Sequence, residues 1–403
     1  TLNLSLKGMA GAEPSVGAGL AARRLNDRAK GSFGIGAKTG GVGGGKEGYL
    51  LHGNTLSRIS GKMSIRGLGP FTGVDRELPP PMANIDTDTD NNIDMDSGIS
   101  PCVVIAGPTA SGKSALALSI AALIGGEIVN ADSMQVYRDL PVLTAIPDAA
   151  DRQAVPHHGY AMIDGADRHS MARWLDDTRG RVAGIRARGR VPMLVGGTGM
   201  YLRAAMEGIA PLPDVPGAIR QQATAMLAEM GGAGFRAELR LHDPVLADRL
   251  DDGDSQRLIR GMEVFMATGQ PLSQWQDTRP EGMIPGSFLC IKVEPPRDIL
   301  YSRINRRFPQ MLEQGAIDEA KAIASRQLDP SLPLMKAVGL PPILAMLEGS
   351  MTHDEMVELA CRDTRRLAKR QMTWFRNQYR AEATLDGNEP AQFLESFLPK
   401  ILP

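Results

Sequence analysis

Eight consecutive residues have the composition and spacing of a phosphate-binding loop. Their sequence, GPTASGKS, matches the pattern G-x-x-x-x-G-K-[ST] at every specified position. The glycines let backbone N–H groups point at an anion, and the helix that follows adds partial positive charge. Lys113 contributes a full charge, and the Ser114 hydroxyl can bind Mg²⁺. The predicted phosphate-binding residues are Gly107, Pro108, Thr109, Ala110, Ser111, Gly112, Lys113 and Ser114.

The ligand of this loop is a diphosphate or a triphosphate, and the loop pattern by itself suggests a nucleoside triphosphate such as ATP. A carboxylate, Asp132, follows the next hydrophobic segment, EIVNA. Open α/β sheets place their ligands at the carboxyl ends of such strands. Asp132 can therefore hold Mg²⁺, accept a proton from a substrate or cap a helix, and the residues alone leave these roles open.

A third chemical group stands in the turn Gly196-Gly197-Thr198-Gly199, which follows the segment VPMLV. A hydroxyl in a glycine turn after a strand can reach a phosphate oxygen or a nucleotide. The alternative is a threonine that only stabilises the turn.

Short apolar segments and helical patterns alternate around these groups. Buried strands are predicted over 102–107, 127–132, 191–199 and 288–296, with a further strand over 158–164. A helix follows the phosphate loop, and another begins after Ser170, a suitable N-cap residue. Long helices are predicted over 297–324 and 353–380. This alternation predicts a P-loop NTPase-like α/β fold, in which helices flank a parallel sheet.

Changes in composition divide the chain into segments. The first hundred residues are rich in glycine and lack apolar periodicity, which predicts disorder. Helical patterns without a clear strand lie between two proline-rich junctions and predict an inserted subdomain. The predicted organisation is a disordered extension (1–98), the first part of the core (99–214), an inserted helical subdomain (215–283), the completion of the core with basic C-terminal helices (284–390) and a tail (391–403).

Composition excludes several classes of protein. The 45 Lys+Arg residues balance 46 Asp+Glu residues, which excludes a uniformly basic nucleic-acid coat. Three cysteines provide neither a disulfide framework nor a C-x-x-C pair. No apolar run approaches the roughly 20 residues that a membrane helix requires. We expect a cytoplasmic protein without a membrane partner, acting as a monomer.

The order of several motifs indicates a family. GPTASGKS, NADSMQVY, LTAIP, PHH, LVGGTGMYLRAAMEG, PLPDVP, DSQRLIRGMEVF, KAVGL and RLAKRQMTWFR follow one another along residues 101–385. Together they resemble bacterial tRNA dimethylallyltransferases, also called tRNA isopentenylpyrophosphate transferases. The resemblance implies that the phosphate loop holds dimethylallyl diphosphate rather than ATP, with Mg²⁺. It also implies a tRNA anticodon stem-loop as partner, with the adenine 3′-adjacent to the anticodon as the acceptor. The inserted subdomain (215–283) is then expected to bind the tRNA.

The resemblance also assigns roles to individual residues. Asp132 matches the general base, and Thr198, Lys113 and Arg220 match the other catalytic positions. Arg220 matches a family arginine near both the diphosphate and the tRNA. The predicted tRNA contacts are Asp132, Ser133, Met134, Gln135, Thr198, Arg220, Gln256, Arg257, Leu258, Ile259, Arg260 and Lys336.

Two other functions use the same phosphate loop. A cytokinin-type isopentenyltransferase prenylates a free adenine nucleotide, and a P-loop small-molecule kinase or ATP-driven RNA-binding module would bind ATP instead. The helical insertion argues against the first alternative, because a small nucleotide needs no such surface. The basic helix near the C-terminus, with Arg362, Arg366 and Arg370 among its cations, also favours RNA.

Overall fold

The structure, a computed structural model, describes residues 46–52, 55–60, 99–212 and 214–386. Strands β1 (Lys46–His52) and β2 (Thr55–Ser60) pair antiparallel within a compact unit, Thr1–Thr87. The remainder of the predicted disordered extension lies outside the described residues, as does the predicted tail from residue 391. All other elements belong to a second unit, Asp88–Pro403.

The second unit contains a six-stranded sheet in which every pair of neighbours is parallel. The strand order is β5-β4-β6-β3-β7-β8. The strands are β3 (Cys102–Ala106), β4 (Gly126–Asn130), β5 (His157–His158), β6 (Val191–Gly196), β7 (Phe288–Val293) and β8 (Ala383–Leu385). The strand that follows β3 in sequence, β4, pairs with β6 rather than with β3, so the chain crosses over the sheet.

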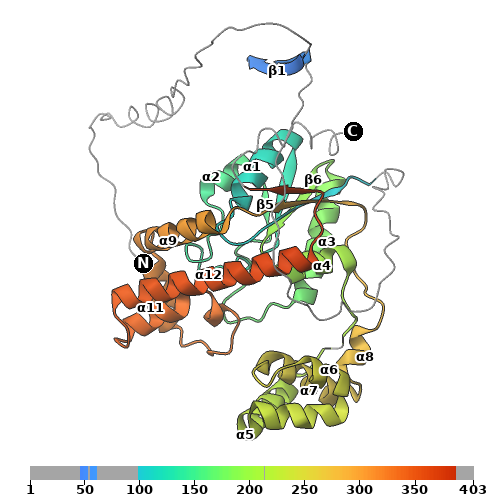
Figure 1. The fold of residues 1–403 in the computed structure, drawn as a ribbon, viewed down its shortest axis with the longest axis vertical. Coiled ribbons are helices and arrows are strands. Elements are labelled where there is room, and N and C mark those ends of the chain that lie inside the picture. Colours follow the sequence, from blue (N-terminus) through green and yellow to red (C-terminus); the bar gives the residue numbers. More distant parts are fainter. Residues whose placement is uncertain (1–45, 53–54, 61–98, 213, 387–403) are drawn as a thin grey trace, which may run out of the picture. The chain divides into compact units, whose positions relative to one another are not determined.

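Helices connect the strands and complete the unit (Figure 1). The long C-terminal helix α12 packs against α9, α11 and α4. The helices outside the inserted subdomain are α1 (Lys113–Ile124), α2 (Ala149–Ala154), α3 (Met171–Ala187), α4 (Gly199–Glu207), α9 (Arg297–Glu313), α10 (Ala316–Ser325), the 3₁₀ helix η2 (Leu334–Lys336), α11 (Leu340–Leu347) and α12 (His353–Gln378).

Both faces of the sheet are covered, which explains the continuous apolar strands. Every residue of β3 is buried, and its side chains alternate between two hydrophobic clusters. Val103 and Ile105 pack with α1, whereas Val104 lies in the cluster that contains Trp174 of α3 and Leu202 of α4. This arrangement confirms the predicted fold class, a parallel sheet flanked by helices.

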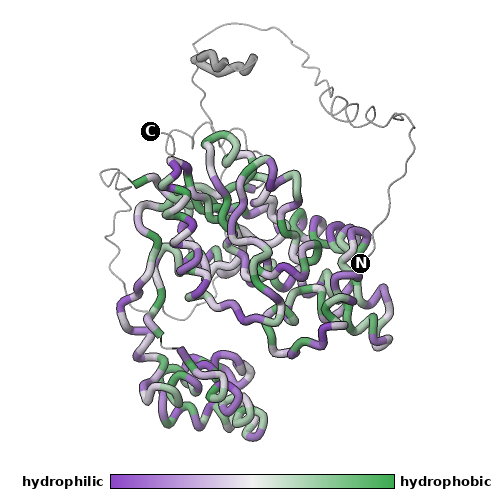
Figure 2. The backbone as a smooth tube through the Cα atoms, turned by 180° about the vertical axis from the view of Figure 1, so that it is seen from behind, coloured by the Kyte–Doolittle hydropathy of each residue, from purple (hydrophilic) through white to green (hydrophobic). Residues whose placement is uncertain are grey.

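Four helices between α4 and β7 have a hydrophobic core of their own. They are α5 (Gly217–His242), α6 (Pro244–Arg249), α7 (Ser255–Thr268) and α8 (Leu272–Gln276). Phe235, Leu239, Leu258 and Met262 are buried together in this core. Hydrophobic and hydrophilic segments alternate along these helices in Figure 2, as expected for amphipathic helices. The predicted limits of the subdomain, 215–283, remain predictions.

Two local predictions are wrong. The strand expected over 158–164 ends at His158, because Gly159 and Ala161 turn the chain with positive φ angles of 81° and 53°. The helix expected over 297–324 is divided into α9 and α10 by Gly315, which has a φ of 107°. The prediction for Ser170 is confirmed, since its side chain accepts a hydrogen bond from the backbone N–H of Arg173 at the start of α3.

Candidate active site

The three chemical groups singled out in the sequence follow three neighbouring strands. The phosphate loop follows β3, Asp132 follows β4 and Thr198 follows β6. Because β6 pairs in parallel with both β3 and β4, the carboxyl ends of these strands meet at one edge of the sheet. The structure therefore brings the predicted phosphate loop, carboxylate and hydroxyl together.

The phosphate loop has a defined internal geometry. Gly112 is the N-cap of α1 with a φ of 97°, a conformation that suits glycine. A side chain on Gly107 would place its Cβ 2.5 Å from the carbonyl oxygen of Val293, so the start of the loop also requires glycine. The Nζ of Lys113 donates to the carbonyl of Pro108 at 3.2 Å. The lysine is thus folded back over the loop that would hold the anion.

The glycines in the turn after β6 accommodate three different neighbours. A Cβ on Gly196 would lie 2.0 Å from the carbonyl oxygen of Ala131, at the end of β4. A Cβ on Gly197 would lie 2.5 Å from Nε2 of Gln371, and one on Gly199 would lie 2.2 Å from the ring of Trp374. The motif therefore lets β4 and helix α12 approach the backbone closely.

Thr198 is hydrogen-bonded to the segment that carries Asp132. Its Oγ1 accepts a hydrogen bond from the backbone N–H of Ser133 at 3.0 Å, and its own N–H donates to the carbonyl of Ala131 at 3.2 Å. The hydroxyl thus holds residues 131–133 beside the turn after β6.

Asp132 is positioned by a buried asparagine. Its backbone N–H donates to Oδ1 of Asn130 at 2.8 Å, and Nδ2 of Asn130 donates to the carbonyls of Asp132 and Gly159. One carboxylate oxygen, Oδ1, accepts from the backbone N–H of Met134 at 2.9 Å. The other oxygen, Oδ2, has no hydrogen-bond partner among the described residues and is available to accept a proton.

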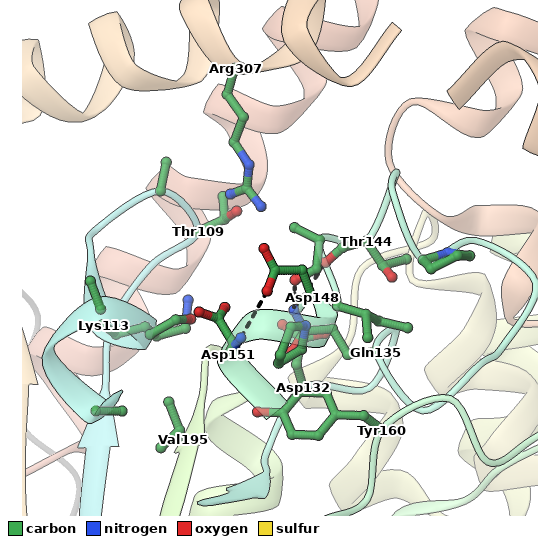
Figure 3. Close-up of a pocket in the computed structure, with 18 of the residues that line it drawn as sticks. Thr109, Lys113, Asp132, Gln135, Thr144, Asp148, Asp151, Tyr160, Val195 and Arg307 are labelled. Atoms are coloured by element: carbon green, nitrogen blue, oxygen red, sulfur yellow. Dashed lines mark hydrogen bonds between the residues drawn. The ribbon is translucent and has the colours of Figure 1, made fainter. Parts of the chain in front are cut away.

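A cavity of about 760 Å³ opens beside these groups, and Figure 3 shows part of its lining. Helix α9 contributes three arginines, and in Figure 3 the guanidinium of Arg307 points into the cavity toward the carboxylates. Positive side chains outnumber negative ones in this lining, which favours an anionic ligand. The charged residues are Lys113, Arg152, Arg303, Arg306 and Arg307, with Asp132, Asp148 and Asp151.

The electrostatics of this cavity shift several pKa values. Burial lowers the pKa of Lys113 to about 8, although the carboxylate of Asp132 opposes the change; the nearby Arg307 lowers it further. Burial also lowers the pKa of Arg307, again against the attraction of Asp132. The pKa of the Tyr160 hydroxyl is raised by burial and by Asp132. The two partly buried cations repel each other, and Asp132 is the carboxylate that stabilises both.

A smaller, mainly apolar cavity of about 100 Å³ shares part of this lining. Asp132, Thr109 and Arg307 border both spaces. The apolar lining of the smaller cavity consists of Ala110, Met134, Leu143, Ile304, Phe308, Met311, Ala337, Val338 and Leu367. Asp132 therefore stands where a charged space meets an apolar one.

The predicted tRNA contacts fall in two regions. Met134 lines the smaller cavity, and Lys336 is exposed directly before Ala337, which also lines it. Gln135 has a structural use, because its Nε2 donates to the carbonyls of Thr144 and Ala145 in the wall of the larger cavity. The side chain of Gln135 thus shapes the site.

The other predicted contacts lie on α5 and α7. Gln256 and Arg257 are exposed, whereas Leu258 is fully buried in the subdomain core and Ile259 is partly buried. Leu258 consequently supports the α7 surface without presenting its side chain.

Arg220 does not line either cavity at the phosphate loop. It pairs with Glu263 through two hydrogen bonds, from Nε at 2.8 Å and from Nη2 at 2.9 Å. Arg260 bonds the same carboxylate at 2.7 Å. The Glu263 side chain is 2% exposed, whereas Arg220 is 44% exposed, so one buried carboxylate holds two arginines at the surface of the helical subdomain.

Several polar side chains that α9 and α12 bring to the site were not predicted from the sequence, among them Arg303, Arg306, Arg307 and Gln371. Arg303, Arg306 and Arg307 repeat at helical spacing on α9, and this repeat was a usable signal for a cationic helix face. Arg303 also donates to the carbonyl of Ser111 in the phosphate loop at 3.0 Å. No sequence pattern indicated Gln371 of α12, because single glutamines are common on the polar faces of amphipathic helices.

The described residues contain no cluster of three or more His, Cys, Asp or Glu side chains arranged for a metal ion. In the same part of the chain, no helix combines the length and apolar character that crossing a membrane requires. Together, the fold and the site define an α/β protein with a P-loop for phosphate groups and a carboxylate beside it.

Comparison with known proteins identifies the family. The model of the IPP transferase family matches residues 135–378. A tRNA dimethylallyltransferase of Maricaulis maris is 51% identical over 280 residues, which cover 70% of this chain and 91% of that protein. One of Paramagnetospirillum magneticum is 46% identical over 307 residues, which cover 76% and 98%. The chain belongs to the IPP transferase family.

A solved structure agrees with this assignment. The full-length tRNA isopentenylpyrophosphate transferase of Bacillus halodurans matches with a TM-score of 0.55 at 32% sequence identity. The match covers 75% of this chain and 97% of the Bacillus protein.

The pKa of Lys113 leads to a testable prediction for anion binding. Below about pH 8 the lysine is protonated and attracts an anion, and above that pH the free protein loses the charge. We expect the dissociation constant for inorganic diphosphate to rise by up to about tenfold per pH unit between pH 8 and 10. Isothermal titration calorimetry across this range measures the effect.

Lys113→Arg is the control, because arginine stays charged between pH 8 and 10. Any pH dependence of its dissociation constant comes from the titration of the diphosphate and of other groups. If the dissociation constants of the wild type and of Lys113→Arg rise by the same factor, Lys113 does not titrate in this range.

Proposed function

We propose that this protein transfers a dimethylallyl group from dimethylallyl diphosphate to the exocyclic amine of the adenine 3′-adjacent to the anticodon in tRNA. Diphosphate is the other product. The observation that supports this most directly is the carboxylate of Asp132, which borders both the charged cavity of the phosphate loop and the apolar cavity. The relatives named tRNA dimethylallyltransferase support the choice of substrates. The phosphate loop and Asp132 come from one chain, so we propose a monomer that acts on tRNA in the cytoplasm.

The larger cavity suits the prenyl donor. The backbone N–H groups of the phosphate loop and Lys113 would bind the diphosphate, and Arg307 would contact it from α9. Cleavage of the allylic C–O bond leaves negative charge on the diphosphate, which these fixed positive groups stabilise as it develops. Arg307 thereby takes the role near the diphosphate that the resemblance assigned to Arg220.

Mg²⁺ fits the donor side. The Ser114 hydroxyl is exposed in the first turn of α1, at the cavity, and has no hydrogen-bond partner in the described part of the chain. Mg²⁺ often takes only one or two protein ligands and completes its coordination with substrate phosphates and water. Ser114 would supply a protein oxygen, and the ion when bound would neutralise charge on the diphosphate.

The acceptor base would enter from the smaller cavity, where Lys336 is exposed near the apolar lining. The target adenine has to leave its stack to reach a site of this depth. Its exocyclic nitrogen then forms the new bond to C1 of the prenyl group as the C1–O bond to the diphosphate breaks. The proton of the amine passes to Oδ2 of Asp132, which accepts no hydrogen bond from the described residues.

The helical subdomain would contact the tRNA away from the reaction. Arg220 and Arg260 share one buried carboxylate, so their outer N–H groups remain partly exposed to solvent. Arginines presented in this way can bind RNA phosphates. We therefore propose that Arg220 contributes to tRNA affinity.

A single assay tests the proposed function. The protein is incubated with labelled dimethylallyl diphosphate, Mg²⁺ and either tRNA or AMP, and the products are separated. We expect label in tRNA. Label in AMP alone would indicate a free-nucleotide isopentenyltransferase, and ATP turnover without prenyl transfer would indicate a kinase or an ATP-driven module; either result rejects the proposal.

Replacement of the proposed base gives a sharper expectation. Asp132→Asn keeps an acceptor oxygen for the N–H of Met134 but removes the basic carboxylate. We expect kcat to fall by about 10²- to 10⁴-fold. The dissociation constant for tRNA, measured by filter binding, should change little, because the fold around residue 132 is retained.

The matched control for this replacement is Asp176→Asn, the same change at an exposed position of α3. Normal kcat in Asp132→Asn would exclude Asp132 as the base.

A comparison of two arginines separates the roles proposed for them. Arg307→Met should lower kcat/KM for dimethylallyl diphosphate by about 10²- to 10³-fold, since it removes a charge that faces the leaving group. Arg220→Met should raise KM for tRNA and leave kcat at saturating tRNA within a few fold. Steady-state kinetics with each substrate varied in turn measures both effects. If Arg220→Met instead lowers kcat/KM for dimethylallyl diphosphate and Arg307→Met only raises KM for tRNA, Arg220 is the residue that contacts the diphosphate.

A further inference from the structure

The side chain of Gln371 joins two turns of the active site. Its Oε1 accepts a hydrogen bond from the backbone N–H of Thr109 in the phosphate loop at 2.9 Å. Its Nε2 donates to the carbonyl of Gly197, in the turn after β6, at 3.0 Å. A backbone N–H can only donate and a carbonyl can only accept, so both partners require this orientation of the amide.

The contact lies beyond the last paired residues of the two strands, Ala106 of β3 and Gly196 of β6. Past that pair the chain leaves the sheet on both sides, and the two turns diverge into α1 and α4. Gly197 makes room for the amide, because a Cβ there would lie 2.5 Å from Nε2. Gln371 thus fixes the distance between the two turns beyond the point where the strand pairing ends.

This spacing extends to the proposed base. Gly197 precedes Thr198, whose hydroxyl accepts from the N–H of Ser133, and Ser133 follows Asp132. Thr109 and Asp132 border both cavities, and Gln371 itself lines the smaller one. Two hydrogen bonds of Gln371, the backbone from Gly197 to Thr198 and the hydrogen bond of Thr198 to Ser133 therefore connect the phosphate loop to the segment of the carboxylate.

Helix α12 holds the glutamine in place. Gln371 is partly buried, and Phe375, one turn further along, is 1% exposed in the main hydrophobic core. Trp374 packs on Gly199, two residues after the carbonyl that Gln371 contacts. The amide is therefore carried on a rigid element rather than on a mobile loop.

We propose that Gln371 is a positioning residue for the transfer reaction, which sets the distance between the diphosphate on the phosphate loop and the base at Asp132. The proposal rests on the proposed function. Transfer requires the amine, the prenyl carbon and the carboxylate to be aligned, and small displacements of reacting groups reduce rates strongly. The residue acts through Thr109 and Gly197 and touches neither reacting atom.

Two variants test this role. Gln371→Met has similar length but makes neither hydrogen bond, so we expect kcat to fall by about 10- to 100-fold while KM for both substrates changes less than about threefold. Gln371→Glu retains the acceptor for Thr109 but, when ionised, has no donor for Gly197. A protonated glutamic acid restores that donor. The kcat of Gln371→Glu relative to wild type should therefore increase as the pH falls from 8 to 6, and that of Gln371→Met should not.

The ratio to wild type removes any pH dependence of kcat that all forms of the protein share. Gln378→Met, at an exposed position near the end of the same helix, is the matched control and should have the kcat of the wild type.

The outcomes separate two conclusions. If wild-type protein transfers no label to tRNA, the proposed function is wrong. If the wild type is active and Gln371→Met keeps its kcat within twofold, or the Gln371→Glu ratio does not change with pH, the positioning role is rejected and the function stands. Should Gln371→Met fail to fold, the pH dependence of Gln371→Glu decides the question, because a role in fold stability alone would change the amount of folded protein and leave kcat per folded molecule at the same ratio to wild type at every pH.

Discussion

The parallel register of β4, β6 and β3 is the constraint on which the site depends. Each strand contributes one chemical group at its carboxyl end, and none of these groups is adjacent in sequence to another. The register determines that Lys113, Asp132 and Thr198 meet at one edge of the sheet. The burial of both faces of the sheet specifies this register, because a slip of one residue would exchange the side chains that face α1 with those that face α3 and α4.

The edge of the sheet is also where helix α12 becomes part of the site. Gln371 contacts Thr109, which lies 262 residues earlier in the chain, and Trp374 packs against Gly199. The glycines of the turn after β6 are needed because other parts of the protein come so close to it. Helix α12 therefore contributes to the geometry of the phosphate loop together with the strand that precedes the loop.

The groups that local motifs encode could be predicted from the sequence. The phosphate loop, Asp132 and Thr198 could be predicted because each follows an apolar strand at a fixed spacing. Arg307 and Gln371 could not, since they reach the site from helices whose patterns report only amphipathicity. The exposure of Arg220 and its pairing with Glu263 depend on the packing of α5 against α7, which no local pattern reveals. The predicted strand over 158–164 was wrong for a similar reason, because the bond from Asn130 to Gly159 stabilises a turn there.

The near-neutral charge of the whole chain hides a strong local imbalance. Lys113 and Arg307 both lie close enough to Asp132 to be attracted by its carboxylate, and burial lowers the pKa of both cations. Without a bound anion, the repulsion between the two cations is unfavourable. The favourable free energy of folding of the rest of the chain offsets it. A diphosphate would relieve the repulsion between the two cations as it binds. Because the cations are already in place, the protein needs no reorganisation when further negative charge develops on the leaving group, which is the condition under which electrostatic stabilisation is most effective.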